Sequence, residues 1–305
     1  RRESACPPPR QASDLGSRLR GAVAARPVTT AAALAIVAAF VAADAAFAAG
    51  HELGALQGLP LSVKDLYGVP GFPVFAGTPR RLPARFEAPG PVVERALAQL
   101  AVVTGKTHTV ELAFGGLGTN PHYPTPVNPW DAEAPRVPGG SSAGAGVSLL
   151  EGSAALAFGT DTAGSVRIPA AWTGTVGLKT TKGRWPTEGI VPLSTTLDTA
   201  GVLTRTVDDQ IVAFSALDPA PGPIPALELA DLRLGRCDDV FFDACSPGVA
   251  EAVEGALGEL GAAGARLDAL PLPMLAEVVE LFGRGGPVST ELFFFLQQEL
   301  PDRLA

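Results

Sequence analysis

The chain has 305 residues, of which 47% are hydrophobic, and a net charge of −8. A chain of this length and apolar content can bury the core of one or two domains, which excludes an intrinsically disordered protein. Because 31 acidic residues outnumber 23 basic ones, no basic field is available for a phosphate backbone, and direct nucleic-acid binding is not expected.

The N-terminal region contains a tail and then an apolar segment. Residues 1–27 are rich in Arg and Pro without an apolar period, which predicts a flexible tail. Residues 31–49 begin with an apolar run of 13 residues that Asp44 closely follows, too short for the ~20 residues of a membrane span. Two interpretations stay open: an alanine-rich packing helix that ends at Gly50, and a signal segment with a cleavage site at 46–48. We favour the helix, and with it a cytoplasmic protein without a membrane anchor.

Strand and helix patterns alternate through the rest of the chain. Short buried runs predict strands at residues 58–64, 101–105, 154–159, 175–178, 232–236 and 265–270. Longer periodic runs predict helices at residues 91–100, 142–150, 166–172, 207–217, 247–260 and 291–300. This alternation favours an α/β layered fold.

Metal and thiol chemistry have little support in the sequence. Cys6, Cys237 and Cys245 lack the spacing of metal ligands, and the interpretation we favour is reduced structural thiols. None of the three histidines stands in a recognisable Ser-His-Asp motif. We therefore expect no metal site.

Two serines stand in glycine-rich segments, 24 residues apart. Ser141 lies in the segment 139–146 (GGSSAGAG), and Ser165 lies in 159–169 (GTDTAGSVRIP). Glycine permits the sharp backbone turns that bring a main chain close to a ligand. A hydroxyl on such a turn, beside free N–H groups, is how proteins build a nucleophile with an oxyanion hole. Upstream, Lys64 lies in the apolar sequence LSVKDL.

These three motifs, in this order, resemble the signature of the amidase signature family of serine amidohydrolases, over about residues 56–218. The resemblance implies an α/β fold with a mixed central β-sheet and helices on both faces. It also implies one amidase signature domain over residues 28–305. Domains of that family are usually longer than the sequence after Leu56, so we expect a C-terminal part to be missing and the pocket to be open.

The resemblance implies a catalytic role for each motif. Ser165 maps onto the nucleophile, Ser141 onto the serine that relays protons, and Lys64 onto the base. In the family the peptide bond before the relay serine is cis, here Gly140–Ser141. Lys64 would have to be neutral, and burial can lower the pKa of a lysine by several units from about 10.4.

Further roles follow from the same resemblance. The oxyanion donors would be consecutive backbone N–H groups, those of Thr162, Ala163, Gly164 and Ser165. Asp161 and Arg167 would support this loop. Asn120 and Ser142 are expected to contact the substrate, although for Asn120 an ordinary surface loop is the alternative. Alanine stands at positions 143 and 163, where the family most often has glycine, and it would be strained if either position needed a positive φ.

Together these features predict hydrolysis of the C–N bond of a small carboxamide through a serine acyl-enzyme, without metal or cofactor. One alternative is the glutaminase component of a tRNA-dependent amidotransferase, its A subunit, which would work with a partner protein. Another is a non-catalytic, shortened homologue. The expected ligand is a small-molecule amide, with no direct contact to nucleic acid or membrane, and a homodimer stays open.

Overall fold

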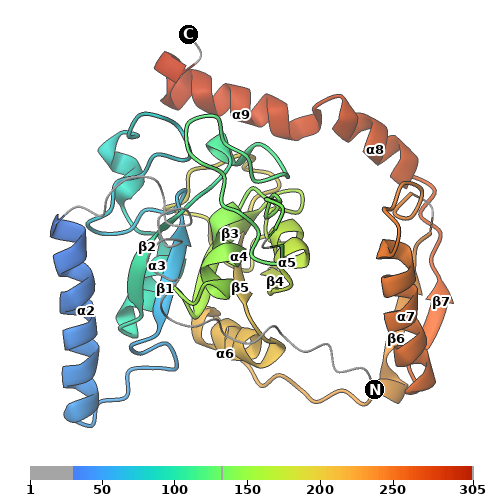
Figure 1. Ribbon diagram of the computed structural model, residues 1–305, viewed down its shortest axis with the longest axis horizontal. Helices are drawn as coiled ribbons and strands as arrows, with labels where there is room; N and C mark the ends of the chain where they lie inside the picture. Colours follow the sequence, from blue (N-terminus) through green and yellow to red (C-terminus); the bar gives the residue numbers. More distant parts are fainter. Residues whose placement is uncertain (1–29, 132, 239, 304–305) are drawn as a thin grey trace. The chain divides into compact units, whose positions relative to one another are not determined.

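The computed structural model describes residues 30–131, 133–238 and 240–303, so the predicted tail at residues 1–27 lies outside the described residues. The chain divides into two compact units, one up to Pro221 and the other from Gly222 (Figure 1). The motif region at 56–218 lies within the first unit, and the prediction of one domain over 28–305 stays a prediction.

A five-stranded mixed sheet forms the centre of the first unit, in the order β2-β1-β3-β5-β4. Its strands are β1 (Pro60–Lys64), β2 (Val102–Thr107), β3 (Leu156–Asp161), β4 (Val176–Lys179) and β5 (Thr199–Thr204). β1 pairs in parallel with both β2 and β3, whereas β5 pairs antiparallel with both β3 and β4. The expected mixed sheet is therefore confirmed.

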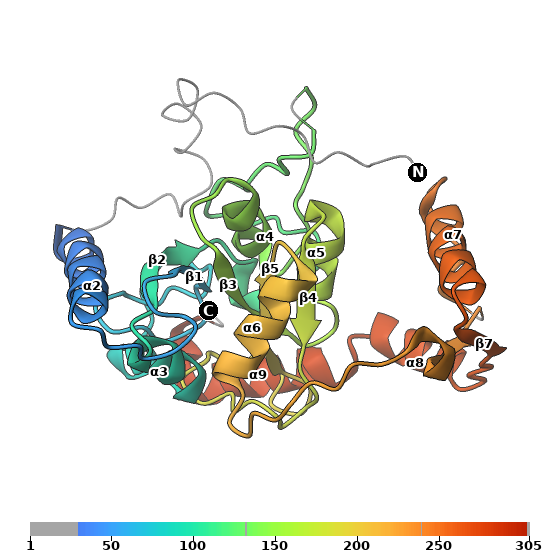
Figure 2. The same cartoon turned by 90° about the horizontal axis from the view of Figure 1, so that it is seen from below.

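Helices cover both faces of this sheet (Figures 1 and 2), as expected. They are α3 (Pro91–Ala98), α4 (Ala143–Leu150), α5 (Arg167–Thr173) and α6 (Val207–Leu217), with short 3-10 helices at Ala84–Glu87 and Glu111–Ala113. Side chains alternate along β3 and so face the two sides of the sheet in turn. Ala157 belongs to a hydrophobic core cluster with residues of α4 and α5, and Phe158 belongs to a larger cluster with residues of α3 and α6. Both clusters are buried, and they hold the sheet between two helical layers.

One central strand, β5, was not predicted from the sequence. Its residues are buried on both faces of the sheet, so the polar alternation that marks a half-exposed strand is absent. Gly201 also interrupts the apolar run at the point where β5 pairs with Gly159 of β3. A side chain at Gly201 would meet the carbonyl oxygen of Leu178 in β4 at 2.6 Å.

Helix α4 lies very close to the sheet because glycine leaves room for it. A Cβ atom on Gly144 would come within 2.6 Å of the backbone nitrogen of His108 and within 2.8 Å of the Cβ of Thr107. The Gly144 N–H donates to the carbonyl oxygen of His108 at 3.0 Å. This close approach brings the N-terminus of α4, where Ser141 and Ser142 lie, to the carboxyl end of β1.

The helix predicted near the N-terminus is present as α2 (Thr30–Ala48), followed by Gly50 in a left-handed conformation. Its packing is limited, because Leu34 and Val41 are 65% and 61% exposed while Ala43 is buried. Among the described residues, no helix combines the length and the hydropathy that crossing a membrane requires. The interpretation as a signal segment is left open by these observations.

The second unit contains a two-stranded parallel sheet, made of β6 (Arg233–Arg236) and β7 (Arg266–Ala269). Helix α7 (Val249–Ala262) connects the two strands, as a parallel pair requires. The helices α8 (Leu275–Gly283) and α9 (Gly286–Glu299) follow, and short 3-10 helices lie at Leu229–Asp231 and Pro301–Arg303. Of these elements, α8 was not predicted from the sequence.

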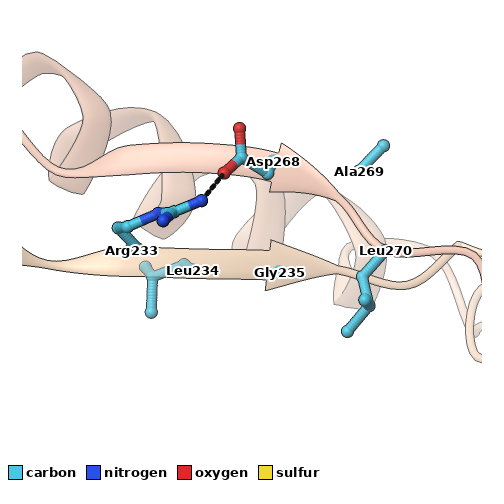
Figure 3. Close-up of a pocket in the computed structure, with 6 residues that line it drawn as sticks. All are labelled: Arg233, Leu234, Gly235, Asp268, Ala269 and Leu270. Carbon is cyan, nitrogen blue, oxygen red and sulfur yellow. Dashed lines mark hydrogen bonds and ion pairs between the residues drawn. The ribbon is translucent and has the colours of Figure 1, made fainter.

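A shallow pocket lies on the strands of the second unit (Figure 3). Across it, Arg233 and Asp268 point toward one another and form an exposed ion pair at 3.3 Å. Its lining residues are Arg233, Leu234, Gly235, Asp268, Ala269 and Leu270. None of the residues predicted to form the site belongs to this pocket.

The contact between α4 and β2 predicts that two alanine substitutions differ in their effect on stability. Gly144→Ala places its methyl group against backbone atoms, so we expect a destabilisation of about 1–3 kcal/mol, typical of overpacking. Gly105→Ala in β2 is the control, because its added Cβ meets no atom within 4 Å. Urea denaturation of both variants measures the difference, and equal midpoints would contradict this account of the helix position.

Candidate active site

The predicted site residues gather where strand ends meet helix starts in the first unit. Lys64 ends β1, Asp161 ends the parallel strand β3, and Ser141 precedes α4. Ser165 lies in the loop between β3 and α5. The Ser142 N–H donates to the carbonyl oxygen of Ser165 at 3.2 Å, which ties the two serine segments together.

Lys64 is fully buried and has two hydroxyl partners. Its Nζ donates to Ser141 Oγ at 2.7 Å and to Thr160 Oγ1 at 2.8 Å. Burial lowers the pKa of Lys64 to about 7, although the charges of Asp198 and Asp161 act in the opposite direction. At neutral pH a large fraction of this amine is therefore uncharged and can accept a proton.

Ser141 and Ser165 have different surroundings. The Ser141 side chain is fully buried against Lys64, and the peptide bond Gly140–Ser141 is cis, as the resemblance implied. The Ser165 hydroxyl makes no hydrogen bond to any residue that the structure describes, including Ser141. The structure thus brings Lys64 and Ser141 into direct contact, whereas the backbone carbonyl of Ser165 is bonded to Ser142, the residue after Ser141.

Asp161 organises the loop that carries Ser165. Its carboxylate is fully buried and accepts hydrogen bonds from the N–H groups of Gly164 at 2.8 Å and Val166 at 3.1 Å. Arg167 reaches the same carboxylate through Nη2 at 2.9 Å and Nε at 3.0 Å. Burial alone would raise the pKa of Asp161, but these hydrogen bonds outweigh it and lower the pKa. Asp161 and Arg167 thus lie in the arrangement that the predicted loop support requires.

The expected oxyanion donors divide into two groups. The Gly164 N–H already donates to Asp161. The N–H groups of Thr162, Ala163 and Ser165 donate to no other group within the described parts of the chain, which leaves them available to an anion. Neither Ala143 nor Ala163 has a positive φ, so alanine causes no backbone strain at these positions.

Asn120 and Ser142, expected to contact the substrate, have their side chains engaged in internal hydrogen bonds. The Asn120 amide nitrogen donates to the carbonyl oxygens of Gly77 at 2.8 Å and Thr109 at 3.0 Å. The fully buried Ser142 hydroxyl lies 3.3 Å from the Thr160 carbonyl oxygen. These contacts give both residues a bracing role, and a direct contact with substrate stays a prediction that the geometry does not favour.

Two residues near the site were missed by the sequence analysis. Thr160 is the second hydroxyl partner of Lys64, and Asp198 accepts a hydrogen bond from Thr162. Thr160 could have been found by extending the predicted strand 154–159 by one residue, toward the glycine-rich segment that carries Ser165. Asp198 had no such signal, because it depends on β5, which the sequence pattern did not reveal.

Fold and site geometry describe an α/β protein in which a buried lysine donates a hydrogen bond to the hydroxyl of a serine in a glycine-rich segment. The family model described as Amidase matches residues 22–292, and the chain therefore belongs to the amidase family.

Curated relatives agree with this assignment. The chain is 58% identical to a 2-amino-5-chloromuconic acid deaminase of Comamonas testosteroni, over 84% of this chain and 56% of the relative. It is 36% identical to the A subunit of a glutamyl-tRNA(Gln) amidotransferase of Chloroflexus aurantiacus, over 78% of this chain and 52% of the relative. The chain thus spans about half the length of these relatives.

Solved structures show the same fold. A crystal structure of an amidase matches 95% of this chain and 64% of its own, with a TM-score of 0.82 and 32% identity. The native peptide amidase from Stenotrophomonas maltophilia matches 92% of this chain and 61% of its own, with a TM-score of 0.73 and 25% identity.

The buried carboxylate of Asp161 predicts a large loss of stability on substitution. Asp161→Asn replaces the carboxylate, which accepts hydrogen bonds on both oxygens, with an amide whose NH₂ group cannot accept them. We expect the free energy of unfolding to fall by about 3 kcal/mol. Asp131→Asn is the control, because Asp131 also accepts two backbone N–H groups and an arginine but lies at the surface. Thermal unfolding compares them, and a control that is affected as strongly as Asp161→Asn would refute the bracing role.

Proposed function

We propose that the chain hydrolyses a C–N bond of a small molecule and releases ammonia or an amine, with Ser165 as nucleophile. The observation that carries this proposal is the 2.7 Å hydrogen bond from Lys64 to Ser141 in a fully buried setting. A lysine with a pKa near 7 can exist as a free amine at neutral pH, and a free amine is a general base.

The reaction proceeds in two halves. Neutral Lys64 accepts the Ser141 proton as Ser141 accepts the proton of Ser165, and the Ser165 oxygen attacks the amide carbonyl carbon. The carbonyl electron pair moves onto oxygen, where the N–H groups of Thr162 and Ala163 stabilise it. Collapse of this intermediate expels the amine, which takes back the proton through Ser141 and Lys64.

The second half repeats these steps with water. Water attacks the acyl-enzyme, the Ser165 oxygen leaves with a proton, and a carboxylic acid is released. The balance is one amide and one water converted to one acid and one ammonia or amine. The proposal calls for no metal and no cofactor, since the serine, the amine and the N–H groups supply nucleophile, base and anion stabilisation.

The substrate class has two candidates. A small carboxamide fits the acyl-enzyme chemistry directly. The second candidate is an unsaturated dicarboxylic acid with an amino group, favoured by 58% identity to a relative named for deamination of 2-amino-5-chloromuconic acid. In that case the Ser165 oxygen adds to the carbon of the imine tautomer and ammonia leaves, and water then displaces the serine oxygen to give a 2-oxo acid.

A glutaminase role beside a partner protein has less support, since the amidotransferase relative described above is only 36% identical. A non-catalytic role is disfavoured by the Lys64–Ser141 contact, which a relic would have no reason to keep. A cytoplasmic location and a homodimer remain predictions.

The nucleophile assignment predicts a severe loss of turnover. Ser165→Ala should lower ammonia release from the carboxamide or aminomuconate substrate by roughly 10³-fold or more, because the attacking oxygen is gone. Ser153→Ala, which removes a hydroxyl bonded to the Ser148 carbonyl near the other end of α4, is the matched control. Ammonia release that persists in Ser165→Ala would rule out the proposed mechanism.

The pKa of Lys64 predicts the pH dependence of Ser165 reactivity. Because only the neutral amine accepts a proton, phosphonylation of Ser165 by a fluorophosphonate should rise about tenfold per pH unit below pH 7 and level off above it. Intact-mass spectrometry measures the rate. The rise in rate below pH 7 is the acid limb of the pH profile. In Lys64→Met this acid limb should disappear along with most of the reactivity, and an unchanged profile would exclude Lys64 as the base.

A further inference from the structure

A buried carboxylate outside the motifs lies beside the loop that carries the nucleophile. Thr199 at the start of β5 pairs with Asp161 at the end of β3, and the two strands are antiparallel. The residue before Thr199 is therefore opposite the residue after Asp161. That register places Asp198 across from Thr162, the first residue of the loop.

The Asp198 carboxylate is held on both of its oxygens. Oδ1 accepts the Thr162 hydroxyl at 2.5 Å. Oδ2 accepts the N–H groups of Leu193 at 2.9 Å and Ser194 at 3.0 Å. The Asp198 backbone carbonyl also accepts Lys182 Nζ at 2.8 Å. With only 7% of its surface exposed, this carboxylate has a fixed position from which to hold Thr162.

The two ends of the loop are thus tied to different carboxylates. Asp161 bonds the N–H groups of Gly164 and Val166, but no hydrogen bond joins it to Thr162 in the described residues. Within the part of the chain that the structure describes, the Thr162 side chain is bonded to Asp198 alone. Without that bond, no side chain would fix the part of the loop that carries the N–H groups of Thr162 and Ala163. Asp161 would still hold the part of the loop from Gly164 to Val166.

We propose that Asp198 is a positioning residue of the active site, which fixes Thr162 through its hydroxyl and so aims the Thr162 and Ala163 N–H groups at the oxyanion. This inference rests on the proposed function, because it gives those groups a role in that reaction. Its action on the substrate is indirect. The hydrogen bond is charge-assisted, a type of bond that is short and directional.

The same carboxylate also acts on Lys64 through its charge. The charged groups that influence Lys64 are Asp198, before β5, and Asp161, at the end of β3, and both raise the Lys64 pKa against the larger effect of burial. Loss of the Asp198 charge would leave Lys64 with a lower pKa. Because the neutral form is the active base, the acid limb of Ser165 reactivity would then move to lower pH.

The test compares hydroxyl variants by the rate of Ser165 phosphonylation with a fluorophosphonate probe, from pH 5 to 9, on the full chain. Thr162→Val removes the hydroxyl at nearly constant volume and should slow labelling about tenfold, less than the loss of an entire oxyanion donor. Its acid limb should stay in place because the Asp198 charge remains. Thr162→Ser keeps the hydroxyl and should restore most of the rate.

The control is Thr180→Val, which removes another buried threonine hydroxyl, bonded to the Ala200 carbonyl at 2.9 Å. It should lose thermal stability as Thr162→Val does but label at the wild-type rate. Asp198→Asn should label slowly and shift its acid limb to lower pH. If this variant does not fold, the two Thr162 variants decide the question.

The outcomes separate this inference from the proposed function. If wild-type Ser165 is labelled and Thr162→Val reacts equally fast, Asp198 does not position the loop, and the proposed function stands. An equal slowing in Thr180→Val would also overturn the inference, since the effect would then be general destabilisation. If Ser165 of the wild type is not labelled at all, the proposed function fails and this inference fails with it.

Discussion

The burial of Lys64 is the constraint on which the rest of the site depends. A lysine without exposed surface has lost its hydration, and hydroxyl oxygens and two carboxylates further away stabilise its ammonium form in its place. Burial and these charges oppose each other, and the balance gives a pKa of about 7. A surface lysine would stay charged, and a buried lysine without anions nearby would hold a proton less readily during turnover. The position at the end of β1, beneath α4, supplies both conditions.

Close packing between helix and sheet is what makes that burial geometrically feasible. Gly144 lets α4 approach β2 until its N-terminal turn covers the end of β1, so the Ser141 hydroxyl comes within hydrogen-bond distance of Lys64. On the neighbouring strands, Gly159 and Gly201 pair opposite each other beneath the loop that carries Ser165. A Cβ on Gly159 would lie 2.8 Å from the Ser142 hydroxyl. Glycines at the contact between helix and sheet therefore leave the space in which the side chains of the site lie.

The sequence predicted those parts of the structure whose signal is local. Lys64, Ser141 and Ser165 stand in short motifs with glycine neighbours, and most strands and helices of the first unit follow from apolar periodicity. β5 was missed because a strand buried on both faces, with Gly201 at its centre, has neither alternation nor a continuous β-branched run. Asp198 was missed for a related reason, since its partner in space, Thr162, is 36 residues away in the chain and is reached only through strand pairing.

Two buried carboxylates near one lysine would be expected to hold it in its charged form, yet both have other partners. Asp161 is bonded to the Arg167 guanidinium, so much of its field is cancelled close to its source. In the described residues, the carboxylate oxygens of Asp198 accept from backbone N–H groups and a hydroxyl, and the nearby Lys182 ammonium donates to the Asp198 backbone carbonyl instead of to the carboxylate. Its charge is therefore the less compensated of the two, which agrees with its larger influence on Lys64. The two carboxylates therefore differ in what they can do. Asp161, paired with Arg167, fixes the loop, whereas Asp198 bonds one hydroxyl and keeps a charge that acts on Lys64 at a distance.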